Sequence, residues 1–554
     1  MQATFRNYAV VISVIVAIIV LSTRNTATSD LFHPALWAED GTVFIKDASD
    51  LGAWSIVTTY AGYLHTIPRL VAYLADFLPL EWTPTLFHAA WIGAFAICVA
   101  VISSRLLANG MKPALVAVVA ALFAGQPQAG EVFFTLTNLQ WVTGVCLAVI
   151  LIFPNETPTK FWHLALIILA GLTGPFSALL LPSLALRAWL FKDLRQYLPF
   201  YLCLAFCGLM QGLLLAFASS GGGHSLLEAS GSSVLQAILT FLAFGNENNI
   251  VRIASFFFWI GVPWVAISIA TWERFLNVKI SEKTANNRNE RYIVAYLAIT
   301  TSLLFMIAAF MRDDLSIISP VIRADGSSAG SRYYLIPYSL ILVSVVLTTF
   351  DQKIRLGIIL VSFTLICLMS FRNPERTRSQ WDDYANLSDN VSGLIIPIAP
   401  RIDGYPGWAV DTTNRVKSID SAVQWKVVPL DSLSQENGHL KTDQTKHSTI
   451  VSSSANFQIS IPLTNYCSTR NDSVAIEVKG KRAFDGIIHL LWGRDDVFSD
   501  KESIATYYPA GEYSAYFAFT HGPSDNTIRI RPGFSDGDSD IQSVRLICLD
   551  QVSR

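Results

Sequence analysis

The sequence contains few charged residues for its length. Of its 554 residues, 15% are charged and 52% are hydrophobic, whereas soluble domains typically carry about 25% charged residues. Positive charge is not in excess either, because the net charge is −2 at pH 7. A nucleic-acid-binding protein is expected to present a basic face. We therefore expect no nucleic-acid partner, and we expect most of the chain to lie in a lipid bilayer.

Long apolar runs fill the first two thirds of the chain. A helix that crosses a bilayer needs roughly 17–25 mostly apolar residues. Eleven runs are candidates, at about 8–22, 86–104, 113–124, 139–153, 161–173, 176–190, 197–217, 251–271, 292–311, 334–350 and 355–371. We therefore expect a polytopic α-helical membrane domain with about 11 transmembrane helices in residues 1–371. The first run lacks a good small-residue cleavage site, so we expect an uncleaved anchor rather than a signal peptide.

Residues 372–554 lack any run of this kind. They contain short alternating segments between turn residues, such as "SVAIEVKG", "GIIHLLWG" and "NTIRIRPG". Alternation bounded by Gly, Asn, Asp and Pro is typical of β-strands. We expect residues 372–554 to form a soluble all-β domain of the β-sandwich or jelly-roll type.

The distribution of basic residues predicts the orientation in the membrane. With the N-terminus placed inside, the inner loops hold about twice as many Lys and Arg as the outer ones, which is the bias that cytoplasmic loops show. Eleven crossings then place the C-terminal domain outside the cytoplasm. The seven cysteines agree with this, because five lie in apolar runs and the remaining two, Cys467 and Cys548, lie in the tail. In an oxidising compartment these two are expected to form a disulfide, the alternative being two buried thiols.

Unusual polar residues gather on the outer side of this topology. The first outer loop, residues 24–85, holds Glu39 and Asp40 in "WAEDG", and then "GYLHTIPR". Ionisable groups at membrane depth cost about 3 kcal/mol each and usually mark a site. Each also has a structural interpretation, since the acidic pair could cap a helix and an arginine could reach lipid headgroups. The convergence of these residues on one face favours a functional site. The candidates are Glu39, Asp40, Tyr63, His65, Arg69, Glu131, Asn138, Gln140, Trp141, His224, Arg332 and Tyr333.

Residues 51–83 are apolar and aromatic, but they are interrupted by Gly62, His65, Pro68 and Arg69. This pattern is too broken to span a bilayer. It predicts an interfacial helix or helix pair that lies along the outer leaflet.

The motifs "WAEDG", "GYLHTIPR", "GEVFFTLTNLQW", "GLTGPFS" and "SRYYLIP", within this layout, resemble the GT-C superfamily of polyprenyl-phosphate-dependent glycosyltransferases. They look like a bacterial group associated with surface polysaccharides, such as O-antigen. The resemblance implies an inner-membrane enzyme with a periplasmic C-terminal domain. It would move a sugar, with inversion, from a polyprenyl-phosphate donor to a glycan or lipid-linked acceptor.

The resemblance also implies roles for the candidate residues. Asp40 or Glu39 would be the base, and the choice between them stays open. The donor phosphate would be held by Arg332, Arg69, His65 and His224. The sugar or acceptor would be bound by Glu131, Asn138, Gln140, Trp141, Tyr63 and Tyr333. No compact ligand cluster accompanies the acidic pair in the sequence, so we expect no divalent metal and no cofactor.

Two other functions compete with this interpretation. A transporter or flippase for a lipid-linked glycan would often show internal repeats and charges at the membrane midplane, and a membrane acyltransferase would require a catalytic histidine with a partner. Neither pattern is evident in the sequence. The sugar, the linkage, the acceptor and the oligomeric state are not determined by it.

Overall fold

A computed structural model of the chain describes about three quarters of the first 380 residues and a large part of the tail. The described residues are 2–23, 34–127, 132–154, 160–218, 238–239, 241–244, 249–259, 283–312, 331–349, 351–369, 381–388, 391, 393–399, 408–412, 425–436, 439–442, 448–452, 457–467, 473–483, 485–494, 497–520, 527–532 and 539–549. Glu131 and His224, both predicted site residues, lie outside them.

The chain divides into two compact units that are not consecutive in sequence. Unit 1 comprises residues 1–34, 56–68 and 88–375, and unit 2 comprises residues 35–55, 69–87 and 376–554. Two segments of the first loop, including the acidic pair, therefore belong to the same unit as the C-terminal strands. The sequence analysis assigned that whole loop to the membrane domain.

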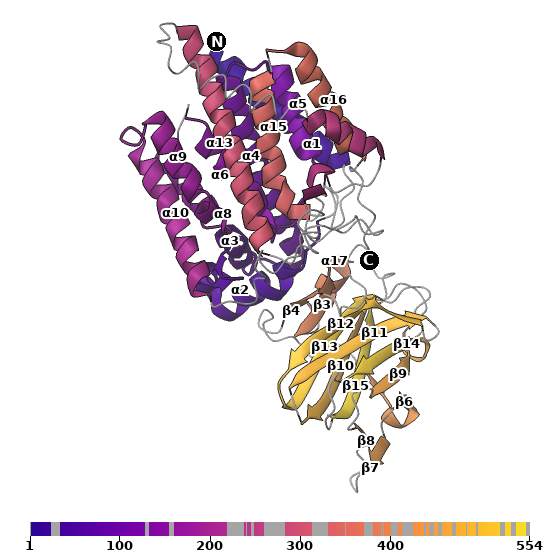
Figure 1. Cartoon of the computed structure of the whole chain (residues 1–554). Coiled ribbons are helices and arrows are strands. Elements are labelled where there is room, and N and C mark those ends of the chain that lie inside the picture. The colour runs from indigo at the N-terminus through magenta and orange to yellow at the C-terminus, as the bar shows by residue number, and fades with distance from the viewer. Residues whose placement is uncertain are drawn as a thin grey trace. The chain divides into compact units, whose positions relative to one another are not determined.

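Helices account for almost all of the regular structure before residue 389 (Figure 1). The α-helices are α1 (Gln2–Thr23), α2 (Lys46–Leu51), α3 (Thr66–Ala75), α4 (Thr83–Ala108), α5 (Pro113–Ala124), α6 (Leu139–Ile152), α7 (Phe161–Gly171), α8 (Phe176–Leu179), α9 (Leu181–Phe191), α10 (Leu198–Phe217), α13 (Lys283–Arg312), α15 (Leu335–Thr349), α16 (Lys353–Met369) and α17 (Trp381–Ser388). A π-helix, η1 (Asp40–Ile45), and the short 3₁₀ helices η2 (Gly52–Val57), η3 (Leu80–Trp82) and η4 (Ser331–Tyr334) complete this part.

Helices α6 and α15 form the centre of unit 1. Every residue of both helices is buried, which is expected of a helix that is apolar on all sides. Helix α15 packs against α6, α13 and α16, while α1 packs against α5. The C-terminal end of α6 is fixed by the buried Arg187, whose Nη1 donates to the carbonyl of Leu151 at 2.8 Å. Arg187 also pairs with Asp193 at 2.9 Å.

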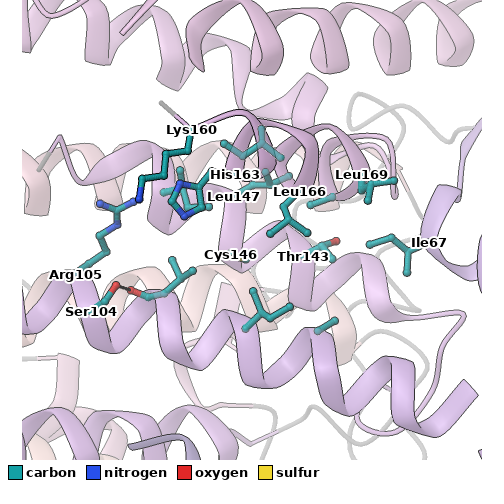
Figure 2. A pocket seen from close by; sticks show the side chains of 16 residues that line it. Ile67, Ser104, Arg105, Thr143, Cys146, Leu147, Lys160, His163, Leu166 and Leu169 are labelled. Atoms are coloured by element: carbon teal, nitrogen blue, oxygen red, sulfur yellow. Dashed lines mark hydrogen bonds between the residues drawn. The ribbon is translucent and has the colours of Figure 1, made fainter. Parts of the chain in front are cut away.

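Five helical segments among the described residues are long and apolar enough to cross a membrane. They are Thr4–Thr23, Leu80–Ala108, Leu198–Phe217, Glu290–Ala309 and Arg332–Thr349. Shorter apolar helices include Pro113–Ala124, Leu139–Ile152, Phe161–Gly171 and Leu181–Phe191. These segments are compatible with a membrane protein, and the count of about 11 spans stays a prediction. A cavity of about 490 Å³ lies between α4, α6 and α7 in unit 1 (Figure 2).

The C-terminal part of unit 2 is rich in β-sheet, in agreement with the sequence analysis. Its strands are β3 (Leu394–Ile398), β4 (Trp408–Asp411), β5 (Lys426–Val428), β6 (Ser434–Glu436), β7 (His439–Thr442), β8 (Ser448–Ser452), β9 (Gln458–Pro462), β10 (Ser473–Arg482), β11 (Gly486–Arg494), β12 (Val497–Tyr508), β13 (Gly511–Thr520), β14 (Thr527–Arg531) and β15 (Ser539–Leu549). One sheet has the order β4-β3-β13-β10-β15-β8-β7, with β5 paired to β15, and the other has the order β12-β11-β14-β9-β6.

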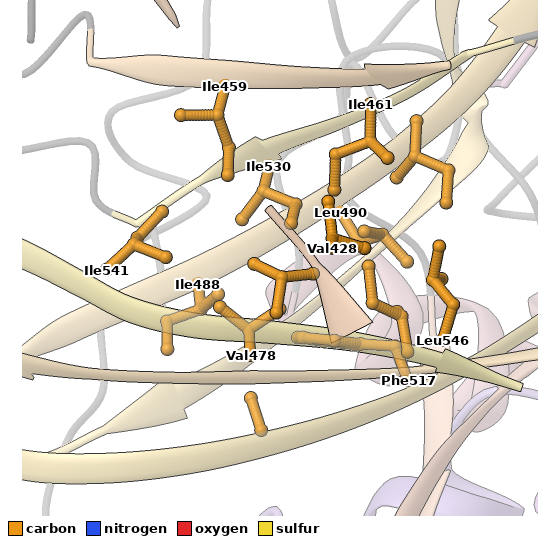
Figure 3. Packing of buried hydrophobic residues seen from close by; sticks show 14 of the residues in the cluster. Val428, Ile459, Ile461, Val478, Ile488, Leu490, Phe517, Ile530, Ile541 and Leu546 are labelled. Atoms are coloured by element: carbon orange, nitrogen blue, oxygen red, sulfur yellow. The ribbon is translucent and has the colours of Figure 1, made fainter. Parts of the chain in front are cut away.

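The two sheets enclose one apolar core. Alternate residues of the strands, among them Val478, Ile488, Phe517 and Ile530, point toward each other in this core (Figure 3). Each is fully buried, so the alternation in the sequence is explained by one buried face per strand. Trp492 also belongs to this core.

A disulfide joins Cys467 to Cys548, the pair that the sequence singles out, with the two Cα atoms 5.6 Å apart. Cys548 lies on β15, opposite Val474 of β10, and Cys467 follows the short helix after β9. The bridge therefore ties the last strand of one sheet to a segment that leaves the other sheet.

The loop after η2 contains a hairpin that the sequence analysis did not predict. Strands β1 (Thr59–Tyr60) and β2 (Tyr63–Leu64) are joined by Ala61 and Gly62, whose φ angles are 53° and 85°. Two central residues with positive φ are typical of the tight turn that suits strand twist. The amphipathic helix α3 follows it. Where an interfacial helix or helix pair was expected, the structure therefore has a hairpin followed by a helix, and their position along the outer leaflet stays a prediction.

Candidate functional site

The predicted site residues fall into two groups, one in each unit. Asp40, Glu39 and Arg69 lie in unit 2, whereas His65, Tyr63, Asn138, Gln140, Trp141, Arg332 and Tyr333 lie in unit 1. Each group is described by itself.

In unit 2, the segment Trp37–Gly41 forms a tight structure that we call the acidic turn. Its first residues contact the residue that follows β3, because the backbone N–H of Ala38 donates to the carbonyl of Ala399 at 2.6 Å. Trp37 and Ala38 pack with Ala399 and Trp408. Ala38 has a φ of 45°, a strained conformation for a residue with a side chain that is often found at functional sites.

Asp40 closes this turn with its side chain and its backbone. Its N–H donates to the Trp37 carbonyl at 2.9 Å, and its Oδ2 accepts the Trp37 N–H at 3.0 Å. This reciprocal pair fixes the turn before η1, whereas Glu39, the N-cap residue of η1, makes no side-chain cap hydrogen bond. The side chain is 1% exposed, while Glu39 is half-buried. The next residue, Gly41, has no side chain, and there is no room for one, because a Cβ there would lie 2.6 Å from the Val410 side chain.

Arg69, on α3, is a buried cation that contacts the helices following the acidic turn. Its Nη1 pairs with Asp47 Oδ2 at 2.8 Å, and its guanidinium carbon lies 5.4 Å from the centre of the Phe44 ring. Its Nε and Nη2 are buried and have no hydrogen-bond partner among the described residues. Buried donors usually have a partner, so these two positions suit an anion.

Asp40 and Phe44 lie four residues apart in η1, which is about one turn. Phe44 is also the ring that the Arg69 guanidinium contacts. Helix η1 therefore carries the buried carboxylate of Asp40 and a contact residue of the buried guanidinium, which itself belongs to α3. A carboxylate can accept a proton, and a guanidinium with open donors can bind a phosphate oxygen.

In unit 1, the hairpin and the loop after α7 build a second polar group, which we call the hairpin cluster (Tyr63, His65, Gln140, Thr173, Gly174 and Gln211). His65 pairs with Thr173 in an isolated β-bridge, and Gly174 N–H donates to the Leu64 carbonyl at 2.9 Å. Tyr63 and His65 have ring centroids 4.7 Å apart.

Gln211 holds the hairpin cluster together. Its Oε1 accepts the Leu64 N–H at 2.9 Å, and its Nε2 donates to the carbonyls of Leu64 at 3.2 Å and Gly174 at 3.0 Å. Gln211 is not among the candidates predicted from the sequence. The available signal was a glutamine inside the apolar run 197–217, because polar side chains at membrane depth are costly.

Gln140, near the start of α6, packs against Gly174 in the loop after α7. Gly174 has a φ of 91°, and a Cβ there would lie 2.6 Å from the Cβ and the Oε1 of Gln140. Gln140 is buried, and its Oε1 has no hydrogen-bond partner among the described residues. Asn138 is the N-cap residue of α6 and is also buried.

Aromatic rings surround the beginnings of the two central helices. Trp141 lies 4.6 Å from Phe176 and 5.1 Å from Tyr333, measured between ring centroids. Arg332, half-buried, extends over the Tyr333 ring at 5.7 Å. Unit 1 thus brings together Tyr63, His65 and Gln140 around one loop, and Trp141 and Tyr333 in one aromatic cluster.

Among the residues that the structure describes, no three His, Cys, Asp or Glu side chains are grouped closely enough to hold a metal ion. The sequence-based expectation that no metal is needed stays a prediction.

No protein-family model and no curated protein matches the chain. Similar solved structures include the CBM36-1 domain of a multidomain xylanase from the hindgut metagenome of Trinervitermes trinervoides (14% identity, 22% of this chain and 97% of that one, TM-score 0.18). They also include a family 29 carbohydrate-binding module from Piromyces equi (10% identity, 22% and 86%, TM-score 0.17) and an exo-beta-1,3-galactanase from Phanerochaete chrysosporium (13% identity, 27% and 34%, TM-score 0.19). At TM-scores this low, the similarities identify neither the fold nor the activity of this chain.

Proposed function

We propose that the protein is an inverting glycosyltransferase of the bacterial inner membrane that uses a polyprenyl-phosphate-linked sugar on the periplasmic side. The observation that supports the proposal is that unit 2 holds a buried carboxylate, Asp40 of η1, and a buried guanidinium, Arg69 of α3, which contacts Phe44 of η1 and has two buried donors without a described partner. The resemblance of the outer motifs to the GT-C superfamily supports the choice of reaction.

The chemistry requires a base and a cation. The acceptor hydroxyl oxygen attacks the anomeric carbon while its proton passes to the carboxylate of Asp40 or Glu39. The bond between the anomeric carbon and the phosphate oxygen breaks, and the electron pair leaves with the polyprenyl phosphate. The donors of Arg69 stabilise the charge on that phosphate.

Unit 1 supplies groups of the kind that bind sugars. Gln140 presents a buried amide oxygen without a described partner, which can accept a sugar hydroxyl. The Trp141 and Tyr333 rings can stack on the apolar face of a sugar ring.

The test is mass spectrometry of the surface glycans of the source bacterium. We expect the gene deletion and the Asp40→Asn variant, at normal expression, to lose the same sugar. The Glu39→Gln variant distinguishes the two candidate bases. If the sugar is lost in Glu39→Gln but kept in Asp40→Asn, Glu39 is the base. The matched control is Asp50→Asn, since Asp50 is an exposed carboxylate of α2 in the same segment, and it should keep the wild-type glycan.

Two results would contradict the proposal. An unchanged glycan in both Asp40→Asn and Glu39→Gln would show that the acidic turn has no catalytic role. A deletion strain that accumulates a lipid-linked glycan intermediate without losing a sugar linkage would instead identify a transporter or flippase.

A further inference from the structure

The cavity between α4, α6 and α7 is lined mainly by apolar side chains (Figure 2). Its volume of about 490 Å³ is large enough for part of an acyl chain. Two of its lining residues, Ile97 and Leu166, are 49% and 41% exposed. The cavity therefore opens sideways, on a surface that a membrane-embedded helix bundle presents to lipid tails.

One end of this cavity is basic. Figure 2 shows Arg105, Lys160 and His163 at one end and Ile67 at the opposite end. The side chain of Arg105 is 5% exposed although it lines the cavity. None of the described lining residues is acidic.

Two neighbouring elements add to the positive potential of this end. Arg6 donates from Nη2 to the carbonyl of Ser104, a lining residue, at 2.9 Å. Lys160 is the N-cap residue of α7, and no side chain caps that end of the helix. The first turn of a helix carries a partial positive charge and backbone N–H groups that favour anions.

We infer that this cavity binds an anionic membrane phospholipid, with the phosphate between Arg105, Lys160 and His163 and an acyl chain along α4 and α7. Lipid tails alone explain an apolar groove in a membrane, but they do not explain buried and exposed cations at one end without an acidic lining residue. Basic pockets between membrane helices on the cytoplasmic side bind anionic headgroups, and Arg105 and Lys160 lie in segments that the charge bias assigns to the cytoplasm. No residue of the acidic turn or of the hairpin cluster lines the cavity, and lipid binding there goes beyond the proposed transfer reaction.

The experiment is native mass spectrometry of the full-length protein in detergent, titrated with phosphatidylglycerol and, separately, with phosphatidylcholine. We expect phosphatidylglycerol to bind at least tenfold more tightly. Lys160→Gln should weaken its binding about tenfold, because a charge-assisted contact is lost. Ala94→Phe should weaken binding of both lipids, since Ala94 lines the apolar part.

The chain offers a close control for each variant. Lys112 is the N-cap residue of α5, with φ −70° and ψ 140°, and Lys160 has φ −74° and ψ 139°. Both lysines are exposed and neither side chain caps its helix, but only Lys160 of the two lines the cavity. Lys112→Gln should therefore leave phosphatidylglycerol binding unchanged, and Val118→Phe on α5 should do the same as the control for Ala94→Phe.

Three outcomes would overturn the inference. Equal binding of phosphatidylglycerol and phosphatidylcholine would show that the cavity does not select an anionic headgroup. An equal loss of phosphatidylglycerol affinity in Lys160→Gln and Lys112→Gln would show a general effect of surface charge. Protection from thermal unfolding by inorganic phosphate alone, to the same extent as by the lipid, would identify a free anion site instead.

Discussion

The carboxylate of Asp40 accepts a hydrogen bond from the backbone N–H of Trp37 at 3.0 Å, and the Asp40 N–H returns one to the Trp37 carbonyl at 2.9 Å. This relationship gives Asp40 a structural role in addition to its proposed chemical one. Since one carboxylate oxygen is committed to the turn, the proton-accepting role falls to the other oxygen or to Glu39. The two roles can be separated by choosing substitutions that keep or remove the hydrogen-bond acceptor.

We predict that Asp40→Ala lowers the free energy of unfolding by about 1 kcal/mol, because the Trp37 N–H loses its acceptor. Asp40→Asn keeps an oxygen at that position and should lose less stability. Both variants should lose sugar transfer. Thermal unfolding in detergent, measured beside the glycan assay, checks this prediction, and equal destabilisation by the two substitutions would contradict it.

The ion pair of Arg69 with Asp47 should respond asymmetrically to mutation. The Arg69 side chain is fully buried, whereas that of Asp47 is 27% exposed. Asp47→Ala leaves a buried charge without its counter-ion and should cost about 3 kcal/mol of stability. Arg69→Met leaves a carboxylate that water can reach and should cost less. A double-mutant cycle measures this, and the double variant should be more stable than Asp47→Ala alone.

Gly174→Ala should disrupt the hairpin cluster. The φ of 91° is unfavourable for alanine, and the new Cβ would lie 2.6 Å from Gln140. We expect a loss of about 2 kcal/mol from the backbone alone and a displaced Gln140 amide, with reduced transfer. Gly93→Ala on α4 is the control, because nothing lies within 4 Å of its Cβ position. That variant should retain activity, and equal loss in both would contradict a specific role for Gly174.

The C-terminal sheet should lose stability in acid through Glu477. Burial raises the pKa of this carboxyl group, but hydrogen bonds from Arg545 and Tyr516 and the charge of Arg545 outweigh burial, so the pKa lies below its ordinary value of 4.5. A pKa that is lowered by folding stabilises the protein above the unfolded value, and this stabilisation is lost as pH falls through the folded value.

We therefore expect the protection of β10 and β15 amides from hydrogen exchange to fall below about pH 4.5 in the wild type. Glu477→Gln should be less protected at neutral pH and should show a weaker acid dependence when the two proteins are compared at each pH. An identical acid dependence in both proteins would assign the effect to other carboxylates.

The sequence by itself determined the classes of secondary structure and where they change. Apolar runs predicted helices up to residue 371 because a bilayer accepts little else. Alternation predicted strands after residue 372 because each strand buries one face, as Val478 and Phe517 do. It also singled out Cys467 and Cys548, which the structure joins.

Only the tertiary structure decided the partners of the polar residues. The acidic turn docks on Ala399, some 360 residues later in the chain, and no local pattern encodes such a contact. Likewise Gln211 binds the backbone of Leu64 and Gly174, and Asp47 neutralises Arg69. Local propensity acts over a few residues, whereas buried hydrogen bonds and ion pairs depend on which distant segments the packing of helices and sheets brings into contact.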